Sequence, residues 1–352
     1  MFINGIGTAT PEKCYSKAEC WEAFRKSDWF GKLDLRAHAV AQAVLLRDNG
    51  IESRYLAVDS LAETFEIDPD ILHQRFLANA PSLASQAGAD ALVDAELQAK
   101  EIDAIVISTC TGYICPGLSG YVIEALGLRK NILAFDLVGQ GCAAALPNLQ
   151  MADALIASGG CRHVLSVCVE VCSAAMYLDN DPGVLISACL FGDGAGAAVV
   201  SANPAQHRRR MQWHRSASSI DTTQRQALQF EQRQCLLRNI LTRRVPQLAG
   251  DQAKQLLDSV LDAADVQKKQ IRTWIMHAGG RDVLLALQKT FGVETDDFRY
   301  SAAMLRQYGN LSSAFVYFVL QAALNDDAEG GWWWLSSFGA GFSCHGALLE
   351  VA

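Results

Sequence analysis

The chain has 352 residues, of which 50% are apolar and 19% charged, so it is long enough for a large core and for about two domains by length. Its net charge of −8 argues against nucleic acid or an anionic membrane as the main partner. The apolar stretches are too short or too interrupted to span a bilayer, and no secretory signal is evident at the N-terminus. Eleven cysteines therefore predict reduced thiols in a cytoplasmic protein.

Strands and helices alternate along the chain. The pattern predicts, in chain order, a strand at 1–8, helices up to 49 and at 61–95, a strand at 102–108, a helix at 118–126, a strand at 132–138, a helix at 143–157, strands at 164–171 and 195–200, helices at 224–243 and 253–265, a strand beginning at Trp274, a helix at 312–324, and strands beginning at Trp332 and covering 347–351. Continuous apolar strands between helices are typical of sheets covered on both faces. The sequence thus predicts an α/β protein.

Cys142 follows the predicted strand 132–138 through a glycine-containing turn and precedes a run of alanines that begins a helix. Glycines permit the tight bend, and the small alanines permit close packing. The unpaired N–H groups and positive dipole end of the helix favour a thiolate at this position. Although a buried structural thiol is the alternative for any free cysteine, this placement is typical of a nucleophile.

The sequence repeats its pattern of elements at an offset of 168 residues. Three blocks of the first half fall on strands or turns of the same kind in the second half. One of the three places Gly141-Cys142 on Gly309-Asn310. We therefore predict two copies of one αβ unit, residues 1–203 and 204–352, with the polar segment 203–219 at the boundary. A pseudo-twofold axis between them would bring together the turns that carry Cys142, His277 and Asn310.

These three residue types permit a particular chemistry. An imidazole beside a thiol can accept its proton, which makes the sulfur nucleophilic. Histidine and asparagine can donate hydrogen bonds to a thioester oxygen that becomes an enolate. No carboxylate general base stands out, but a carbanion formed by loss of CO2 needs none. The set predicts acyl transfer to Cys142 followed by decarboxylative carbon–carbon bond formation, without a metal site.

Five blocks, in order, resemble the signatures of type III polyketide synthases, the chalcone-synthase-like enzymes: Gly141-Cys142, residues 190–195, His277 to Gly280, Tyr308 to Ala314, and Phe338 to Gly341. With the N-terminal strand, the resemblance covers essentially the whole chain. It implies a thiolase-like fold, a duplicated αβαβα layered architecture with a pseudo-twofold axis, and a homodimer. It also implies malonyl-CoA and an acyl-CoA starter as substrates, with no other cofactor.

The resemblance implies roles for individual residues. Cys142 would carry the starter and the growing chain, while His277 and Asn310 would bind the thioester oxygen of malonyl-CoA. Coenzyme A contacts are expected at Arg54, Gly279 and Gly280, with Arg47 and Arg208 to Arg210 as further candidates for its phosphates. The expected cavity wall consists of Cys110, Thr111, Cys115, Cys172, Ala175, Ser312 and Gly339.

Small residues in this wall predict the starter. Ala175 and Cys172 stand where plant relatives have threonines, and Cys115 where they have a methionine. An apolar tunnel gains about 0.8 kcal/mol per buried methylene of a fatty chain. We therefore expect a medium- or long-chain acyl-CoA starter and an alkylpyrone- or alkylresorcinol-type product.

Three other functions were weighed against this hypothesis. A ketoacyl-carrier-protein synthase of the fatty-acid-initiating kind shares the fold and triad, but it follows its histidine with a Gln-Ala-Asn type sequence rather than Ala-Gly-Gly. A papain-like protease has a similar order and spacing of Cys, His and Asn. Its cysteine signature is absent here, and the duplicated α/β pattern is wrong for that fold. A scaffold without turnover is disfavoured because all three triad residues are present.

Overall fold

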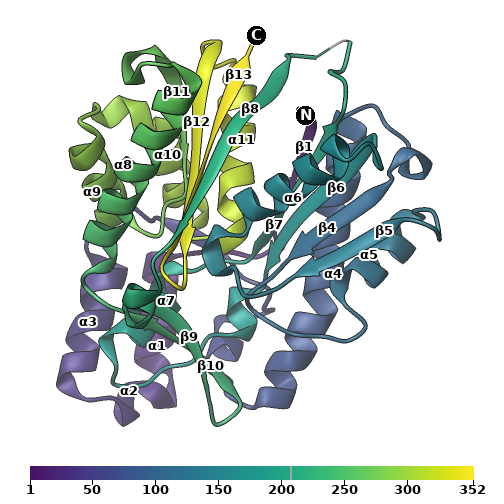
Figure 1. Cartoon of the computed structure of the whole chain (residues 1–352). Helices are drawn as coiled ribbons and strands as arrows, with labels where there is room; N and C mark the ends of the chain where they lie inside the picture. The colour runs from purple at the N-terminus through teal and green to yellow at the C-terminus, as the bar shows by residue number, and fades with distance from the viewer. Residues whose placement is uncertain (207) are drawn as a thin grey trace.

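The computed structural model describes residues 1–206 and 208–352 (Figure 1). Its strands are β1 Phe2–Ala9, β2 Cys14–Ser16, β3 Ser53–Tyr55, β4 Ala104–Ser108, β5 Leu133–Leu137, β6 His163–Glu170, β7 Gly194–Ser201, β8 Met211–Ile220, β9 Leu228–Arg233, β10 Leu236–Leu241, β11 Ile271–Met276, β12 Gly331–Gly339 and β13 Ser343–Val351. Its α-helices are α1 Lys17–Lys26, α2 Asp28–Lys32, α3 Leu35–Leu46, α4 Pro69–Asp94, α5 Leu118–Leu126, α6 Ala145–Ala157, α7 Pro182–Leu190, α8 Val245–Ala264, α9 Arg281–Phe291, α10 Arg299–Tyr308 and α11 Phe315–Asn325.

Nine strands form the main sheet in the order β11-β12-β13-β8-β1-β7-β6-β4-β5. The order and direction are symmetric about the junction of β1 and β8, which are joined by the pair Phe2–Gln212. On one side β1 pairs antiparallel with β7, β7 pairs antiparallel with β6, and β6 pairs parallel with β4. On the other side β8, β13, β12 and β11 follow in the same directions. Each half therefore repeats one αβ unit, and β5 extends the N-terminal half at its edge.

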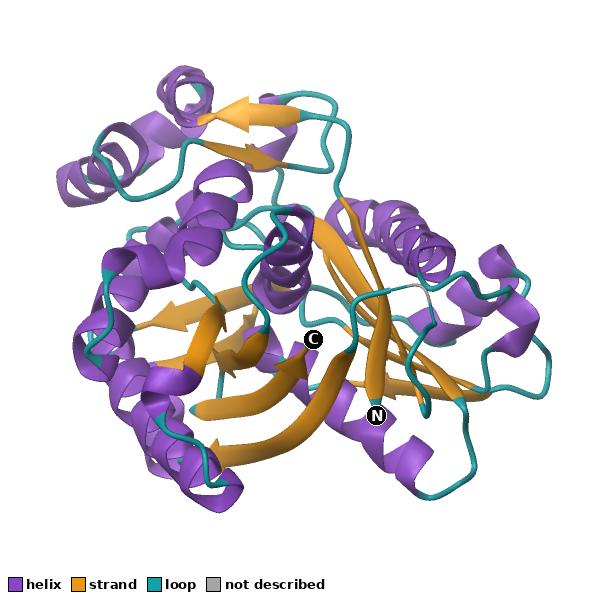
Figure 2. Ribbon diagram, turned by 90° about the horizontal axis from the view of Figure 1, so that it is seen from above, coloured by secondary structure: helices purple, strands orange, loops and turns teal. Residues whose placement is uncertain are grey.

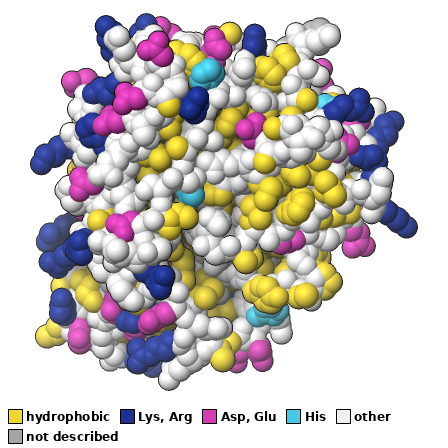
Figure 3. All heavy atoms as spheres, viewed as in Figure 1, with side chains coloured by type: hydrophobic (Ala, Val, Ile, Leu, Met, Phe, Trp, Pro, Cys, Tyr) yellow, Lys and Arg dark blue, Asp and Glu magenta, His cyan; other side chains and the backbone are white. Residues whose placement is uncertain are grey.

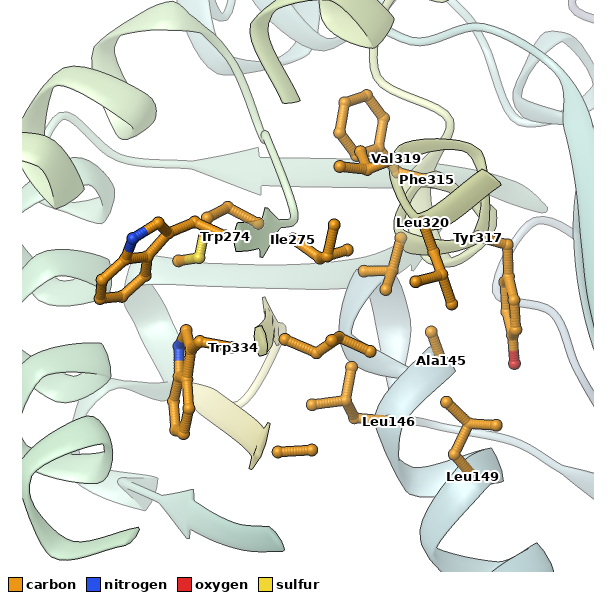
Figure 4. Close-up of a cluster of buried hydrophobic side chains, with 14 of the residues drawn as sticks. Ala145, Leu146, Leu149, Trp274, Ile275, Phe315, Tyr317, Val319, Leu320 and Trp334 are labelled. Atoms are coloured by element: carbon orange, nitrogen blue, oxygen red, sulfur yellow. The ribbon is translucent and has the colours of Figure 1, made fainter. Parts of the chain in front are cut away.

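The two helices that follow the functional turns, α6 and α11, lie in the middle of the molecule between the two halves of the sheet (Figure 2). Both helices carry apolar residues on more than one side. Such a helix is stable only where several neighbouring elements cover it, and the middle of the molecule provides them. Figure 4 shows Leu146 and Leu149 of α6 beside Leu320 of α11, with Trp274 and Trp334 on the neighbouring strands. Both tryptophans are at most 2% exposed. This core fixes the turns at the starts of α6 and α11.

Helices α1, α2 and α3 and the hairpin β9–β10 form a lobe at one end of the molecule (Figures 1 and 2). Phe24 and Leu33 of this lobe pack against Met176 and Leu185, which belong to the loop after β6 and to α7. The hairpin is fixed by Arg238, whose Nη2 and Nη1 lie 2.8 Å from Asp181 and 2.9 Å from Glu231. The lobe therefore covers the region where β6 ends.

One of the predicted elements was wrong. Residues 224–243, expected to be helical, form the hairpin β9–β10, whose turn places Gln234 and Cys235 in the left-handed region at φ +51° and +63°. A hairpin turn of this kind usually signals itself by asparagine or glycine, which this turn lacks. Residues 211–219 of the expected polar boundary belong to β8, the first strand of the C-terminal half of the sheet, and His207, also in that boundary, lies outside the described residues. Among the described helices, none combines the length and the hydropathy needed to cross a membrane.

Candidate active site

Cys142 lies in a single 3-10 turn, Gly141–Ala143, between β5 and α6. Gly141 has φ +55°, a conformation that glycine adopts at little cost, and a Cβ there would lie 3.3 Å from the backbone nitrogen of Ala340. The end of β12 backs the turn, where Ser337 Oγ donates to the carbonyl of Ala143 at 2.8 Å. The turn, which belongs to the N-terminal half, is therefore fixed by the C-terminal half, and Cys142 is 8% exposed.

His277 follows β11, and Asn310 and Ser312 precede α11. The backbone N–H of Ser312 donates to Asn310 Oδ1 at 2.9 Å, and Asn310 Nδ2 donates to the carbonyl of Gly279 at 3.3 Å. Ser312 Oγ lies 3.2 Å from Cys142 Sγ. These contacts bring the turns of Cys142 and Asn310 and the His277-Ala278-Gly279 loop to one centre.

The hydrogen bonds of Asn310 also fix the orientation of its amide. Because Oδ1 accepts from a backbone N–H, the NH2 group must face the other way. One of its hydrogens is used by the carbonyl of Gly279. The second hydrogen is available to a substrate oxygen, as an oxyanion-binding role requires.

Burial determines the protonation of the two titratable triad members. It lowers the pKa of His277 to about 3 and raises the pKa of Cys142 to about 12. Two aromatic rings, Phe338 and Phe315, pack edge-on to the imidazole at centroid distances of 5.0 and 5.6 Å. Burial thus outweighs the helix terminus that was expected to favour a thiolate, and it favours the neutral thiol and the neutral imidazole.

Glu170, at the end of β6, is a fully buried carboxyl group beside the site that the sequence interpretation did not single out. Its oxygens accept from Thr111 Oγ1 at 2.9 Å, from the backbone N–H of Cys110 at 3.0 Å and from Ser313 Oγ. Ser312 Oγ, the neighbour of Cys142 Sγ, lies 3.3 Å from Glu170 Oε1. One hydroxyl therefore separates a buried carboxyl from the nucleophile. A single glutamate within an apolar strand was the only sequence signal.

A small cavity of about 40 Å³ adjoins Ser312. The structure lines it with five of the predicted wall residues, Cys110, Thr111, Cys172, Ala175 and Ser312. The sequence interpretation missed the remaining wall residues, since they come from α7, the hairpin and the loop after β6: Met176, Tyr177, Val184, Ser187, Ala188, Phe191, Phe230, Leu237 and Asn239.

Two other predicted wall residues lie elsewhere. Cys115 is exposed, in the loop before α5, and does not line this cavity in the described chain. Gly339, at the end of β12, packs behind the nucleophile: a Cβ there would lie 2.8 Å from the backbone nitrogen of Ala143. Its role is close packing.

Arg54 is not a coenzyme A ligand in this structure, contrary to the sequence expectation. Its side chain is 4% exposed and donates to the backbone carbonyls of Ala188 at 2.7 Å and Phe191 at 2.9 Å. It therefore ties β3 to the end of α7. Two of the further candidates, Arg208 and Arg209, pair with Asp94 and Asp327. Gly280 begins α9, beside Arg281.

Comparison with known proteins identifies the chain. Residues 23–264 match the family described as FAE1/Type III polyketide synthase-like protein, and residues 216–351 match the C-terminal domain of chalcone and stilbene synthases. The chain belongs to the type III polyketide synthase family. The resemblance drawn from the sequence is confirmed, and the synthase is an acyltransferase-type condensing enzyme of secondary metabolism.

The synthase is similar to bacterial members of this family. It is 26% identical to the 3,5-dihydroxyphenylacetyl-CoA synthase of Amycolatopsis orientalis, over 98% of this chain and 92% of the relative. It is 29% identical to the 1,3,6,8-tetrahydroxynaphthalene synthase of Streptomyces griseus, over 86% of this chain and 82% of the relative.

Solved structures confirm the thiolase-like fold. The 1,3,6,8-tetrahydroxynaphthalene synthase of Streptomyces coelicolor A3(2) superposes with a TM-score of 0.87 at 25% identity, over 99% of each chain. PKS-I of the brown alga Ectocarpus siliculosus superposes with a TM-score of 0.91 at 22% identity, over 99% of this chain and 98% of its own.

Proposed function

We propose that the synthase loads an acyl group from a coenzyme A thioester onto Cys142 and extends it with malonyl-CoA by decarboxylative condensation, and that the extended chain then cyclises. The observation that carries this proposal is the convergence of Cys142, Asn310 and the His277 loop through Ser312 and Gly279. Loading transfers the acyl group from the sulfur of coenzyme A to Cys142 Sγ, and the thiol proton leaves through His277 to the departing thiol.

Extension needs no added base. The bond to the malonyl carboxylate breaks with loss of CO2, and its electron pair forms an enolate at the thioester. The N–H of the neutral His277 ring and the second N–H of Asn310 would stabilise this oxyanion. The enolate carbon then attacks the acyl carbon on Cys142, and the C–S bond breaks with the electron pair returning to sulfur. Each cycle adds two carbons.

An aliphatic starter fits the cavity wall best. Most of the wall is apolar, with Met176, Val184, Ala188 and Leu237 among its members. A second, largely apolar cavity lies beneath α1 and α3 and shares Met176 and Ala188 with the first. An acyl tail that passes between these two side chains would gain about 0.8 kcal/mol for each buried methylene. An alkylpyrone or alkylresorcinol remains the expected product type.

Coenzyme A would lie across the loop that carries Gly279 and Gly280. Three cations contact the segment 47–52 beside this loop. Lys17 Nζ donates to the carbonyl of Arg47 at 2.9 Å, Arg281 donates to the carbonyl of Asp48, and Arg306 pairs with Glu52. These side chains are at least partly exposed. Exposed cations are suited to bind the phosphates of coenzyme A.

A homodimer in the cytoplasm is the proposed state of the protein. The edge strand β5 and the loop after it expose Leu133 by 46% and Val138 by 63%, and the loop before α5 exposes Tyr113 by 74%. Figure 3 shows hydrophobic side chains gathered on this side of the molecule, over β4 and β5. An apolar patch at an unpaired sheet edge is suited to pair with a second copy.

The experiment is a panel of acyl-CoA starters from acetyl to palmitoyl, with aromatic starters, malonyl-CoA alone and carrier-protein thioesters, read by CO2 release and by mass spectrometry of products. We expect condensation with medium- or long-chain acyl-CoA and no need for a carrier protein. The names of the relatives describe hydroxylated aromatic products. If malonyl-CoA alone gives a product, malonyl-CoA also supplies the starter unit, and the proposal of an aliphatic starter is wrong. No CO2 release under any condition would refute the function.

A further inference from the structure

One polar group of the active-site cavity has no role in the triad. Asn239, on β10, is 7% exposed and lines the cavity together with Ser312. Its Nδ2 donates to Ser187 Oγ at 3.0 Å. Its Oδ1 is buried and has no hydrogen-bond partner in residues 1–206 and 208–352. A buried oxygen without a partner is costly, and Asn239 borders a cavity, so a ligand group that enters beside this side chain would supply the missing partner.

The hydrogen bonds of Ser187 establish which amide atom is free. Ser187 Oγ donates its single proton to the carbonyl of Gly183 at 2.8 Å. With that proton in use, the hydroxyl can only accept a hydrogen bond from Asn239. The Asn239 amide must therefore point its NH2 group toward Ser187 Oγ. The atom left free is thus the amide oxygen. Only a hydrogen-bond donor can satisfy it.

The surroundings hold this oxygen in place. The adjacent Arg238 joins β10 to Asp181, the N-cap of α7, at 2.8 Å, and α7 carries Ser187. The strand and the helix are therefore tied at two successive positions. Ser312, which lies 3.2 Å from Cys142 Sγ, lines the same cavity as Asn239, so the cavity wall that Asn239 helps to form begins one side chain away from Cys142.

Few groups on the reacting chain can donate a hydrogen bond. A saturated acyl tail has no donor, and a β-polyketone in its keto form has only acceptors. Its enol tautomer has one, because a proton moves from the methylene between two carbonyls to one of their oxygens. We propose that Asn239 Oδ1 accepts a hydrogen bond from an enol hydroxyl of the extended chain and so determines which carbon closes the ring.

This assignment rests on the proposed function. Enolisation makes one carbonyl carbon less electrophilic and the adjacent carbon more nucleophilic, with no oxidant or reductant needed. Asn239 is thus a positioning residue for cyclisation, and it takes no part in loading or decarboxylation. Changing it should alter the distribution of products while leaving CO2 release intact.

The test compares Asn239→Leu with Arg233→Leu, an exposed position on the same hairpin. With octanoyl-CoA and malonyl-CoA, Asn239→Leu should release CO2 at about the wild-type rate. Its ratio of the main cyclised product to open-chain and alternative products should fall by about tenfold, the scale of one lost hydrogen bond. Arg233→Leu should match the wild type in both measurements.

Ser187→Ala provides a second route if Asn239→Leu does not fold. It leaves Asn239 in place but frees the amide to rotate, so the product ratio should fall in the same direction. A wild-type product ratio in folded Asn239→Leu, or loss of CO2 release with the product, would overturn the assignment. A change seen only with a hydroxyacyl-CoA starter would also overturn it, because the donor would then be the starter hydroxyl. Absence of CO2 release from the wild type would instead refute the proposed function.

Discussion

Ser312 Oγ lies 3.2 Å from Cys142 Sγ, although the two residues are 170 positions apart in the chain. Ser312 also has φ +51°, which is uncommon for a residue other than glycine and is found where surrounding contacts impose it. Its N–H is bonded to Asn310 Oδ1. The strained backbone therefore orients the Asn310 amide and places a hydroxyl at the nucleophile, so one residue links both halves of the site.

Cys142→Ala should abolish acyl loading and product formation while the protein stays folded. The turn already contains Gly141 and Ala143, so a smaller side chain fits there. The measurement is mass spectrometry of the intact and digested protein after incubation with an acyl-CoA. Cys110→Ala is the matched control, because Cys110 Sγ lies 3.4 Å from the same Ser312 hydroxyl. An acyl adduct on Cys110 with Cys142→Ala still active would contradict the assignment.

His277→Gln and Asn310→Asp should each slow decarboxylation of malonyl-CoA by at least about 10²-fold, as expected for loss of an oxyanion donor. His277→Gln should also slow iodoacetamide labelling of Cys142 at pH 7. The reason is that burial raises the pKa of this thiol to about 12, and the imidazole is its proton acceptor in the proposed function. Asn310→Asp leaves the imidazole in place and is the control for labelling. Unchanged CO2 release in both variants would remove them from the site.

The sequence predicted much of this arrangement, because the turns and the repeat of elements are visible in the order of the residues. Glycine turns before helices located Cys142 and Asn310, and the 168-residue offset predicted the symmetry of the sheet. The hairpin β9–β10 gave no such signal, since its turn has neither asparagine nor glycine, and so Asn239 and Phe230 were missed. Arg54 was misassigned because burial decides whether an arginine meets solvent or backbone carbonyls. Spacing along the chain does not reveal that.

Arg281→Ala should raise the KM for acyl-CoA with little change in kcat, because the lost contact is to phosphate and not to the reacting atoms. A thioester of N-acetylcysteamine, which has the same acyl group but no phosphate, provides the control. Its KM should be the same in the wild type and the variant. An equal loss with both thioesters would show that Arg281 acts through the structure of the Asp48 loop instead.

His345 should make the protein less stable in acid. Burial lowers the pKa of His345 to about 4 from its ordinary value of 6.5, so below pH 6.5 the unfolded chain binds a proton that the folded chain does not. Stability from this group is thus present above pH 6.5 and is lost as the pH falls toward 4. Between pH 8 and pH 5 the wild type should lose about 2 kcal/mol more unfolding free energy than His345→Gln. Equal losses in urea titrations of the two proteins would show that His345 titrates normally.

The protein should be a homodimer, with twice the 38.2 kDa of one chain by light scattering at micromolar concentration. Leu133→Lys is designed to disrupt it. Leu133 is 46% exposed on the edge strand β5, where a lysine costs little in one chain but would have to be buried opposite its own copy. Leu35→Lys is the control, since Leu35 is 85% exposed on the distant helix α3. Leu133→Lys should be a folded monomer and Leu35→Lys a dimer. A monomeric wild type would contradict the proposed state, and a dimeric Leu133→Lys would place the interface elsewhere.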